Sequence, residues 1–179
     1  MSTCLGLYIE NNLIKYAKVT KEHDQVKVES FGTKFYDNLD QAIKQVIEET
    51  YSYRIPISTN LSEEIYNYFN VFGLLSKKDL PKAIKTEFEA YCGDKGYNPN
   101  VFETRYALTP NTQEKEKIKV IHVSENKIEL NKKLQKFSSY HLQNIAPISM
   151  TISDITEFDE RQNALIVNIE EKTIITTIL

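Results

Sequence analysis

Residues 3–20 read TCLGLYIENNLIKYAKVT, and this stretch decides the fold that we expect for the whole chain. Two apolar runs flank the pair Asn11-Asn12, which predicts a tight hairpin turn because asparagine tolerates positive φ. A second pair of apolar, β-branched runs closes the sequence, ALIVNIE at 164–170 and KTIITTIL at 172–179. The two predicted hairpins, at opposite ends of the chain, look like degenerate copies of one structural element.

The composition bounds the class of protein. The chain has 179 residues, enough for one large or two small domains with a real core. It is 41% hydrophobic and 26% charged, and its net charge of -3 provides no field to attract nucleic acid. The N-terminus lacks the pattern of a signal peptide, and no apolar run approaches the roughly 20 residues of a membrane span, so we expect no direct membrane insertion. Cys4 and Cys92 have no CxxC partner, which favours a reducing, cytosolic setting.

Residues 1–60 predict the order β-β-β-α-β. After the hairpin, 25–33 alternates as a third strand, and 53–58 (YRIPIS) reads as a short strand whose Pro56 indicates an edge or a bulge. Between them, Asn38 or Asp40 opens a helix with one apolar stripe, formed by Leu39, Ala42, Ile43, Val46 and Ile47. This order opens the ribonuclease H-like folds, which include the actin-like fold.

Residues 64–147 predict a second unit with the order β-α-β-β-α-β. Its strands are expected at 64–72, 102–108, 117–123 and 142–147. Ser76 or Asp79 caps the first helix, which runs to about Tyr91 before a turn at 92–96. Ser124 caps the second helix, which runs through Phe137 with Ile128 and Leu134 on or near its apolar face.

The different orders of elements expected in 1–60 and in 64–147 predict one domain inserted into another. Residues 148–158 read weakly as a helix, and the terminal hairpin then returns to the style of the first. We therefore expect a discontinuous domain of 1–60 plus 148–179 and an inserted domain of 61–147. Because the sequence stops at Leu179 within an apolar strand, we expect the natural chain to continue.

The arrangement resembles the type IV pilus assembly protein PilM family, relatives of the cell-division protein FtsA. The resemblance rests on three stretches: YFNVFGLLSKKDLPKAIKTEFEAY at 68–91, KVIHVSENKIELNKKLQKF at 119–137 and LIVNIEEKT at 165–173. It implies an α/β fold in which an actin-like (ribonuclease H-like) subdomain 1A, 1–60 plus 148–179, is interrupted by a small SHS2-type subdomain 1C at 61–147.

In this family the first hairpin binds phosphate through a D-x-G sequence followed by Ser or Thr. Here Tyr8 stands in the place of the acid and Glu10 in the place of the glycine, next to the turn residues Asn11 and Asn12. Lys15 matches a basic position that is common after the hairpin. A glycine lets backbone amides approach a phosphate, and an acid holds Mg²⁺ through water, so this hairpin lacks both features.

The second hairpin departs in the same way. Asn168 stands for the acid and Glu170 for the glycine, with Thr173 as the hydroxyl residue. Two carboxylates, Glu10 and Glu170, would face a triphosphate and repel it. The resemblance therefore implies nucleotide binding that is lost or much weakened; we expect no cofactor, with ATP and Mg²⁺ as the alternative.

Other polar residues give weaker signals. Glu10 and Glu170 could form a catalytic carboxylate pair, but exposed acids are ordinary at hairpin turns. His23, His122 and His141 have no metal-ligand spacing, so we expect no metal site. Cys4 reads as a core residue, and Cys92, at the end of a helix, as partly exposed at best and not a nucleophile.

Tyrosine and phenylalanine are dense around 51–72. This density suits an interface, although strands also favour aromatic residues in general. The resemblance implies a groove between 1A and 1C that captures an extended peptide, the cytoplasmic tail of a PilN-like membrane protein. The residues expected to line it are Tyr53, Ile55, Tyr66, Tyr68 and Val71.

The leading hypothesis is a non-catalytic, actin-like scaffold at the inner face of the cell membrane, in a type IV pilus or related assembly machine. Its expected partners are the peptide tail and other copies of itself. One alternative is an ATP-binding actin-like ATPase or FtsA-like division protein whose second lobe is absent from this chain. Another is an unrelated two-domain α/β binding protein; what separates it from the first is whether strands 3–33, 53–58 and 164–179 share one sheet.

Overall fold

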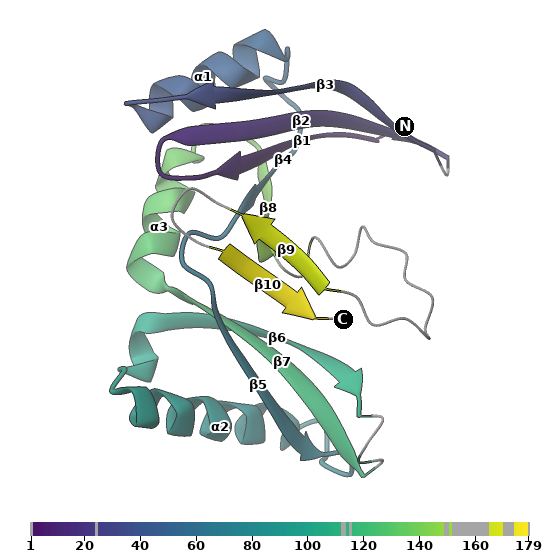
Figure 1. Ribbon diagram of the computed structural model, residues 1–179, viewed down its shortest axis with the longest axis vertical. Coiled ribbons are helices and arrows are strands. Elements are labelled where there is room, and N and C mark those ends of the chain that lie inside the picture. The colour runs from purple at the N-terminus through teal and green to yellow at the C-terminus, as the bar shows by residue number, and fades with distance from the viewer. Residues whose placement is uncertain are drawn as a thin grey trace. The chain divides into compact units, whose positions relative to one another are not determined.

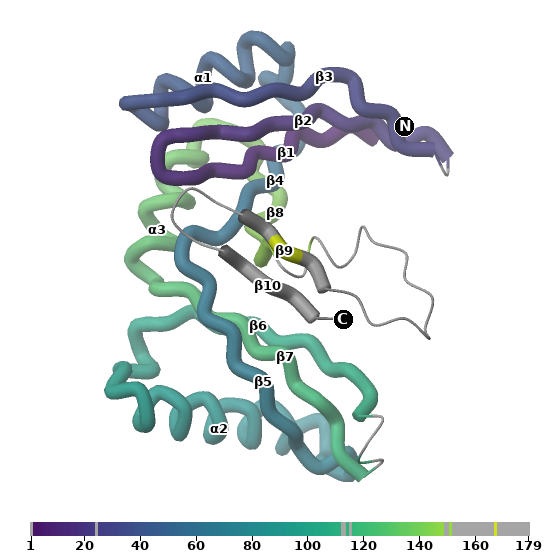
Figure 2. Tube along the Cα trace, in the orientation of Figure 1, coloured from purple at the N-terminus to yellow at the C-terminus, as the bar shows by residue number. Residues whose placement is uncertain are grey.

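The computed structural model describes residues 2–23, 25–111, 114, 116–148, 151, 165–169 and 174–178. The chain divides into two compact units, Met1–Ser62 with Lys133–Leu179 and Glu63–Lys132 (Figure 1). The trace in Figure 2 shows the chain leaving the first unit after β4 (Ile57–Asn60) and returning through α3 (Lys127–Lys136). None of the described helices is long and apolar enough to cross a bilayer.

A five-stranded mixed sheet forms the first unit. Its strand order is β3-β2-β1-β4-β8. β1 and β2 form the predicted hairpin, β2 pairs antiparallel with β3, and β4 lies parallel to both β1 and β8. The strands of this sheet, besides β4, are β1 (Ser2–Ile9), β2 (Leu13–Glu22), β3 (Gln25–Phe35) and β8 (Leu142–Ala146).

Helix α1 (Leu39–Glu49) covers one face of this sheet. The side chain of Asn38 accepts a hydrogen bond from the Gln41 backbone N–H at 3.1 Å, so Asn38 is the helix cap, one of the two predicted. The predicted apolar stripe is confirmed, since Ala42, Ile43, Val46 and Ile47 are all buried. They pack against a core completed by Leu5, Leu7, Ile14, Ile57 and Phe137.

The second unit is a three-stranded antiparallel sheet with a helix on one face. Its strand order is β5-β7-β6, and its core joins Val71, Ile84 and Val120. Phe88 of the helix lies edge-on to Phe102, with ring centroids 6.0 Å apart. The elements are β5 (Ile65–Phe72), α2 (Leu80–Lys95), the short 3-10 helix Pro99–Val101, β6 (Phe102–Pro110) and β7 (Lys117–Asn126).

Both predicted element orders, β-β-β-α-β and β-α-β-β-α-β, are confirmed, but several boundaries were wrong. The strand expected at 53–58 begins at Ile57, because Thr50 to Pro56 form turns after α1. Helix α2 continues past Tyr91 to Lys95, where Gly96 ends it with a φ of 70°. Its N-cap is Asp79, whose backbone N–H bonds to Ser76 Oγ at 3.2 Å.

Helix α3 also begins later than predicted. Ser124 is a strand residue of β7, paired with Ile65 and Thr104, and it caps nothing. Asn126 Oδ1 instead accepts a hydrogen bond from the Ile128 backbone N–H at 2.8 Å. Ile128 and Leu134 are exposed, and the buried side chain of α3 is Lys133, whose ammonium donates to the Asn60 carbonyl at 2.6 Å.

The C-terminal part of the inserted domain differs from the prediction. Residues 133–147 were assigned to the insertion, but β8 pairs with β4 in the sheet of the first unit, so the division falls between Lys132 and Lys133. Only Ile148 and Thr151 of the helix expected at 148–158 lie within the described residues.

The terminal hairpin pairs with itself. β9 (Leu165–Ile169) and β10 (Ile174–Ile178) form a two-stranded antiparallel sheet and are described by their backbone. Among the described pairings, the strands near the N-terminus and β4 therefore share one sheet, and the terminal hairpin does not join it.

Candidate functional site

The tip of the β1–β2 hairpin is closed by its own backbone and by Tyr36. The Glu10 N–H donates to the Leu13 carbonyl at 2.9 Å, leaving Asn11 and Asn12 as an exposed two-residue loop. Neither asparagine has a positive φ, so the predicted use of that conformation was wrong. The Tyr36 N–H donates to the Asn12 carbonyl at 2.8 Å, and its hydroxyl donates to the Glu10 carbonyl at 2.5 Å. Burial raises the pKa of Tyr36, which keeps this hydroxyl protonated as a donor.

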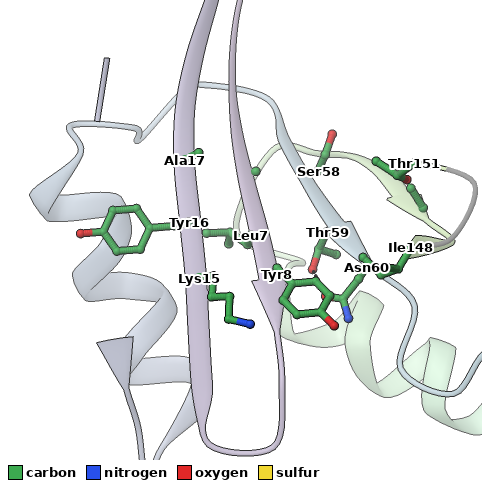
Figure 3. A pocket seen from close by; sticks show the side chains of 12 residues that line it. Leu7, Tyr8, Lys15, Tyr16, Ala17, Ser58, Thr59, Asn60, Ile148 and Thr151 are labelled. Carbon is green, nitrogen blue, oxygen red and sulfur yellow. Dashed lines mark hydrogen bonds between the residues drawn. The ribbon is translucent and has the colours of Figure 1, made fainter. Parts of the chain in front are cut away.

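The charged residues nearest the turn of the hairpin, Glu10 and Lys15, neutralise each other. Lys15 Nζ lies 2.5 Å from Glu10 Oε1, and only 9% of the Glu10 side chain is exposed. The same ammonium lies 5.2 Å from the ring centroid of Tyr8, the residue in the place of the family's acid (Figure 3). The ammonium of Lys15, expected near a phosphate, is therefore already paired with the carboxylate that the resemblance places at the glycine position.

A cavity of about 350 Å³ lies beside this hairpin, on the sheet face opposite α1. Small residues that sit opposite one another in register open it: Gly6 faces Ala17 on one side and Ser58 on the other. Tyr8, Lys15 and Asn60 stand at one end (Figure 3). This cavity was not predicted from the sequence, although small residues at matching positions of adjacent strands are its signal.

Asn60 is fully engaged in holding β1 to β4. Its Oδ1 accepts from the Ile9 N–H at 2.8 Å, and its Nδ2 donates to the carbonyls of Ile9 and Leu61 at 3.1 and 2.8 Å. Since every polar atom of this amide has a protein partner, Asn60 acts here as a structural clamp. Among the described residues, the surface of the cavity wall is mainly apolar.

The second hairpin gives no comparable geometry. Asn168 lies opposite Ile175 in the ladder of β9 and β10, and its backbone alone is described. Glu170 and Thr173 lie outside the described residues. The hypothesis of a Glu10–Glu170 pair therefore stays a prediction.

The residues expected to line a peptide groove belong to both units. In the first unit, Tyr53 is 63% exposed after α1, whereas Ile55 packs against the core. In the second unit, Tyr66 and Tyr68 stack on β5 with centroids 6.2 Å apart and planes within 8°. Val71 is only 5% exposed and belongs to the core with Ile84 and Val120, so its side chain is not at the surface.

The histidines and cysteines lie in structural settings. His122 is buried, with its ring centroid 4.5 Å from that of Phe88, and burial lowers its pKa. No group of three or more potential metal-ligating side chains occurs in the part of the chain that the structure describes. Cys4 contacts Ser58 Oγ at 3.6 Å on the face away from the core, so its prediction as a core residue was wrong. Cys92 is completely buried, which agrees with the prediction that it is partly exposed at best. Burial raises the pKa of Cys92.

Known proteins resemble this chain in structure but not detectably in sequence. No protein-family model and no curated protein matches it. A chain of the PilM–PilN type IV pilus biogenesis complex superposes with a TM-score of 0.77 and 16% identity over 98% of this chain. The cytoplasmic domain of EpsL, an inner membrane component of the type II secretion system of Vibrio cholerae, gives a TM-score of 0.65 and 9% identity, covering 98% of this chain and 71% of its own.

A third structure, a protein of unknown function with an actin-like ATPase fold from Bacteroides thetaiotaomicron, gives a TM-score of 0.46 and 11% identity, covering 99% of this chain and 65% of its own. The present chain spans 57% of the length of the chain in the PilM–PilN complex. It has the fold that the first two structures share, and the resemblance to the PilM family read from its sequence is confirmed for the fold.

Proposed function

We propose that this chain is a non-catalytic scaffold of a membrane-associated assembly machine of the type IV pilus or type II secretion kind, acting at the cytoplasmic face of the membrane. The observation that carries the proposal is the Glu10–Lys15 ion pair at 2.5 Å. A phosphate reaching this hairpin would have to displace a carboxylate from the lysine and then lie beside that carboxylate, which would repel it.

The proposed work of the scaffold is to capture an extended peptide by strand addition, the peptide being the cytoplasmic tail of a PilN-like membrane protein. Strand β5 is an edge strand of its sheet, so one side of its backbone has no partner strand among the described residues. Tyr68 on this strand is 55% exposed and stacks on Tyr66, whose hydroxyl donates to Glu64 Oε2 at 2.7 Å. Backbone bonds along such an edge would supply affinity, and the tyrosine pair would select side chains.

Fluorescence anisotropy tests this function with labelled peptides that tile the cytoplasmic tails of the source organism's pilus and secretion membrane proteins. The account predicts saturable binding of one tail, weakened about tenfold by Tyr68→Ala because an aromatic anchor is lost. Tyr106→Ala is the matched control, since Tyr106 is a 43% exposed tyrosine on the opposite edge strand β6. Absence of binding by every tail, or equal loss in both variants, would contradict peptide capture at β5.

A further inference from the structure

Four exposed apolar side chains of the first unit lie on its edge strand β3. Val26, Val28, Phe31 and Phe35 are 66%, 53%, 79% and 75% exposed. All four lie within one strand, which is the outermost of the sheet. Exposed apolar edge strands are association sites unless charges or proline blunt them. β3 contains no proline, and its Lys27 and Lys34 lie on the other face of the strand, because they pair with Thr20 and Ile14.

A β-bulge places these four side chains on one face. The pairing with β2 shifts between Lys18 and Val19: Lys18 faces Ser30, whereas Val19 faces Val28, so Glu29 is the additional residue. Side chains alternate along a regular strand, so without the bulge the even-numbered Val26 and Val28 would point opposite to the odd-numbered Phe31 and Phe35.

The additional residue is anchored on the α1 side of the sheet. Thr20 Oγ1 donates to Glu29 Oε1 at 2.5 Å, and Lys18 Nζ lies 3.3 Å from Glu29 Oε2. These contacts, the threonine hydrogen bond first, lower the pKa of Glu29 and keep the carboxylate ionised. The bulge is therefore fixed by specific partners, and with it the common direction of the apolar side chains.

The backbone of β3 is also open along its outer side. The Tyr36 N–H donates inward to the Asn12 carbonyl at 2.8 Å, and Lys34 pairs with Ile14. Because inward and outward backbone groups alternate in an antiparallel ladder, the N–H and C=O groups of 31, 33 and 35 point outward. No strand pairs with this edge among the described parts of the chain.

The sequence of this edge is symmetric about Thr33. Residues 31–35 read FGTKF, with a phenylalanine two positions before the threonine and another two positions after it. Placed antiparallel to its own copy about a two-fold axis at Thr33, each Phe31 lies opposite a Phe35 and the two threonines face each other. Aromatic and threonine cross-strand pairs of this kind stabilise sheets.

We propose that two copies of this chain associate through β3, as antiparallel strands related by a two-fold axis at Thr33. The three outward pairs would form about six backbone hydrogen bonds. On the other face Lys34 would lie opposite Gly32 of the second copy, and its ammonium is already 2.5 Å from Glu49 Oε1, so no like charges face each other. This inference concerns a different strand from the peptide site and does not depend on the proposed function.

Sedimentation equilibrium of the whole chain tests the association. The wild type is expected to show a monomer–dimer equilibrium, and Thr33→Pro to lose it, because proline removes the outward N–H at the axis without removing a bond to β2. Phe31→Lys is expected to raise the dissociation constant about tenfold or more through two lost aromatic pairs. Phe72→Lys, a 63% exposed phenylalanine on β5, is the control and should leave the dimer intact.

Cysteine cross-linking tests the register, in a Cys4→Ser background in which Cys92 is completely buried. The Cα atoms of facing residues at the axis lie about 5.5 Å apart, within disulfide range, so Thr33→Cys should form a covalent dimer on oxidation. Phe35→Cys should not, since its two copies would be offset by four residues, about 13 Å. A wild type that stays monomeric up to its solubility limit, a Thr33→Pro variant that still dimerises, or equal cross-linking of both cysteine variants overturns the proposal.

Discussion

The ammonium of Lys15 lies 2.5 Å from Oε1 of Glu10, across the turn of the first hairpin. The pair joins Lys15, on β2, to the acid that directly follows β1, which the resemblance places at the family's glycine position. The hairpin thus satisfies its own charges, and Tyr36 occupies the carbonyls of Glu10 and Asn12. Its geometry is that of a closed structural turn.

The ion pair should contribute modestly to stability. Glu10→Gln is expected to lower the free energy of unfolding by about 0.5–1 kcal/mol, because the carboxylate is mostly buried while the lysine is partly exposed to solvent. Urea denaturation measures it. Glu48→Gln is the control, since the Lys44–Glu48 contact is long, 3.9 Å, and exposed. Equal effects of the two substitutions would show that the Glu10 pair has no special role.

Position 32 requires a glycine because the side chain of Tyr16 lies directly against it. A Cβ at Gly32 would lie 2.7 Å from the hydroxyl of Tyr16 and 2.9 Å from its Cζ. Gly32→Ala should therefore destabilise the first unit by about 1–3 kcal/mol through overpacking. Gly93→Ala is the opposite case: nothing lies within 4 Å of its added methyl group and it is within α2, so stability should rise by up to about 1 kcal/mol. Thermal unfolding of both variants checks the contrast, and a harmless Gly32→Ala would contradict the packing described.

Asn60 should be critical for joining β1 to β4. Asn60→Ala removes the partners of the Ile9 N–H and carbonyl and leaves both groups partly buried, at a cost of about 2–4 kcal/mol. Asn70→Ala, an exposed asparagine on β5, should change stability by less than about 0.5 kcal/mol. Denaturant midpoints measure both, and a shift at Asn60 as small as that at Asn70 would rule out the clamp.

His122 should make the second unit sensitive to acid. Burial lowers its pKa in the folded state, so the unfolded state binds more protons as the pH falls through the unfolded value of about 6.5. Stability should accordingly be highest above that pH and should decrease between about pH 7 and 5. His122→Phe removes the titrating group and should flatten this profile, whereas His141→Gln, at an exposed position, should not. Parallel profiles for wild type and His122→Phe would contradict the assignment.

Periodic signals in the sequence predicted much of the fold. The stripe of α1 places four buried side chains at helical spacing, and both element orders follow from alternation and turn residues. The apolar face predicted for α3 was wrong: Ile128 and Leu134 are exposed. The buried side chain of this helix is Lys133, which donates a hydrogen bond to the distant Asn60 carbonyl. A hydrogen bond between residues so far apart in sequence leaves no local pattern.

The candidate sites were less accessible to sequence reasoning. Replacement of the glycine and acid in the first hairpin was visible, but the direct pairing of Glu10 with Lys15 required the register of β1 and β2. The aromatic density around β5 was visible too, yet Val71 proved to be core and Tyr68 surface, a distinction set by the position of α2. The bulge at Glu29 depends on contacts with Thr20 and Lys18 on the neighbouring strand, which no single-strand pattern reveals.

Isothermal titration calorimetry of this chain with ATP and Mg²⁺ tests the central claim most directly. The account predicts no binding heat at millimolar nucleotide, because the hairpin cation is paired with Glu10 and no glycine opens the backbone to a phosphate. Glu10→Gly, which frees Lys15, is the companion variant, and any gain of binding there would locate the block at this residue. Micromolar binding by the wild type would contradict the scaffold account and make the first hairpin a working nucleotide site.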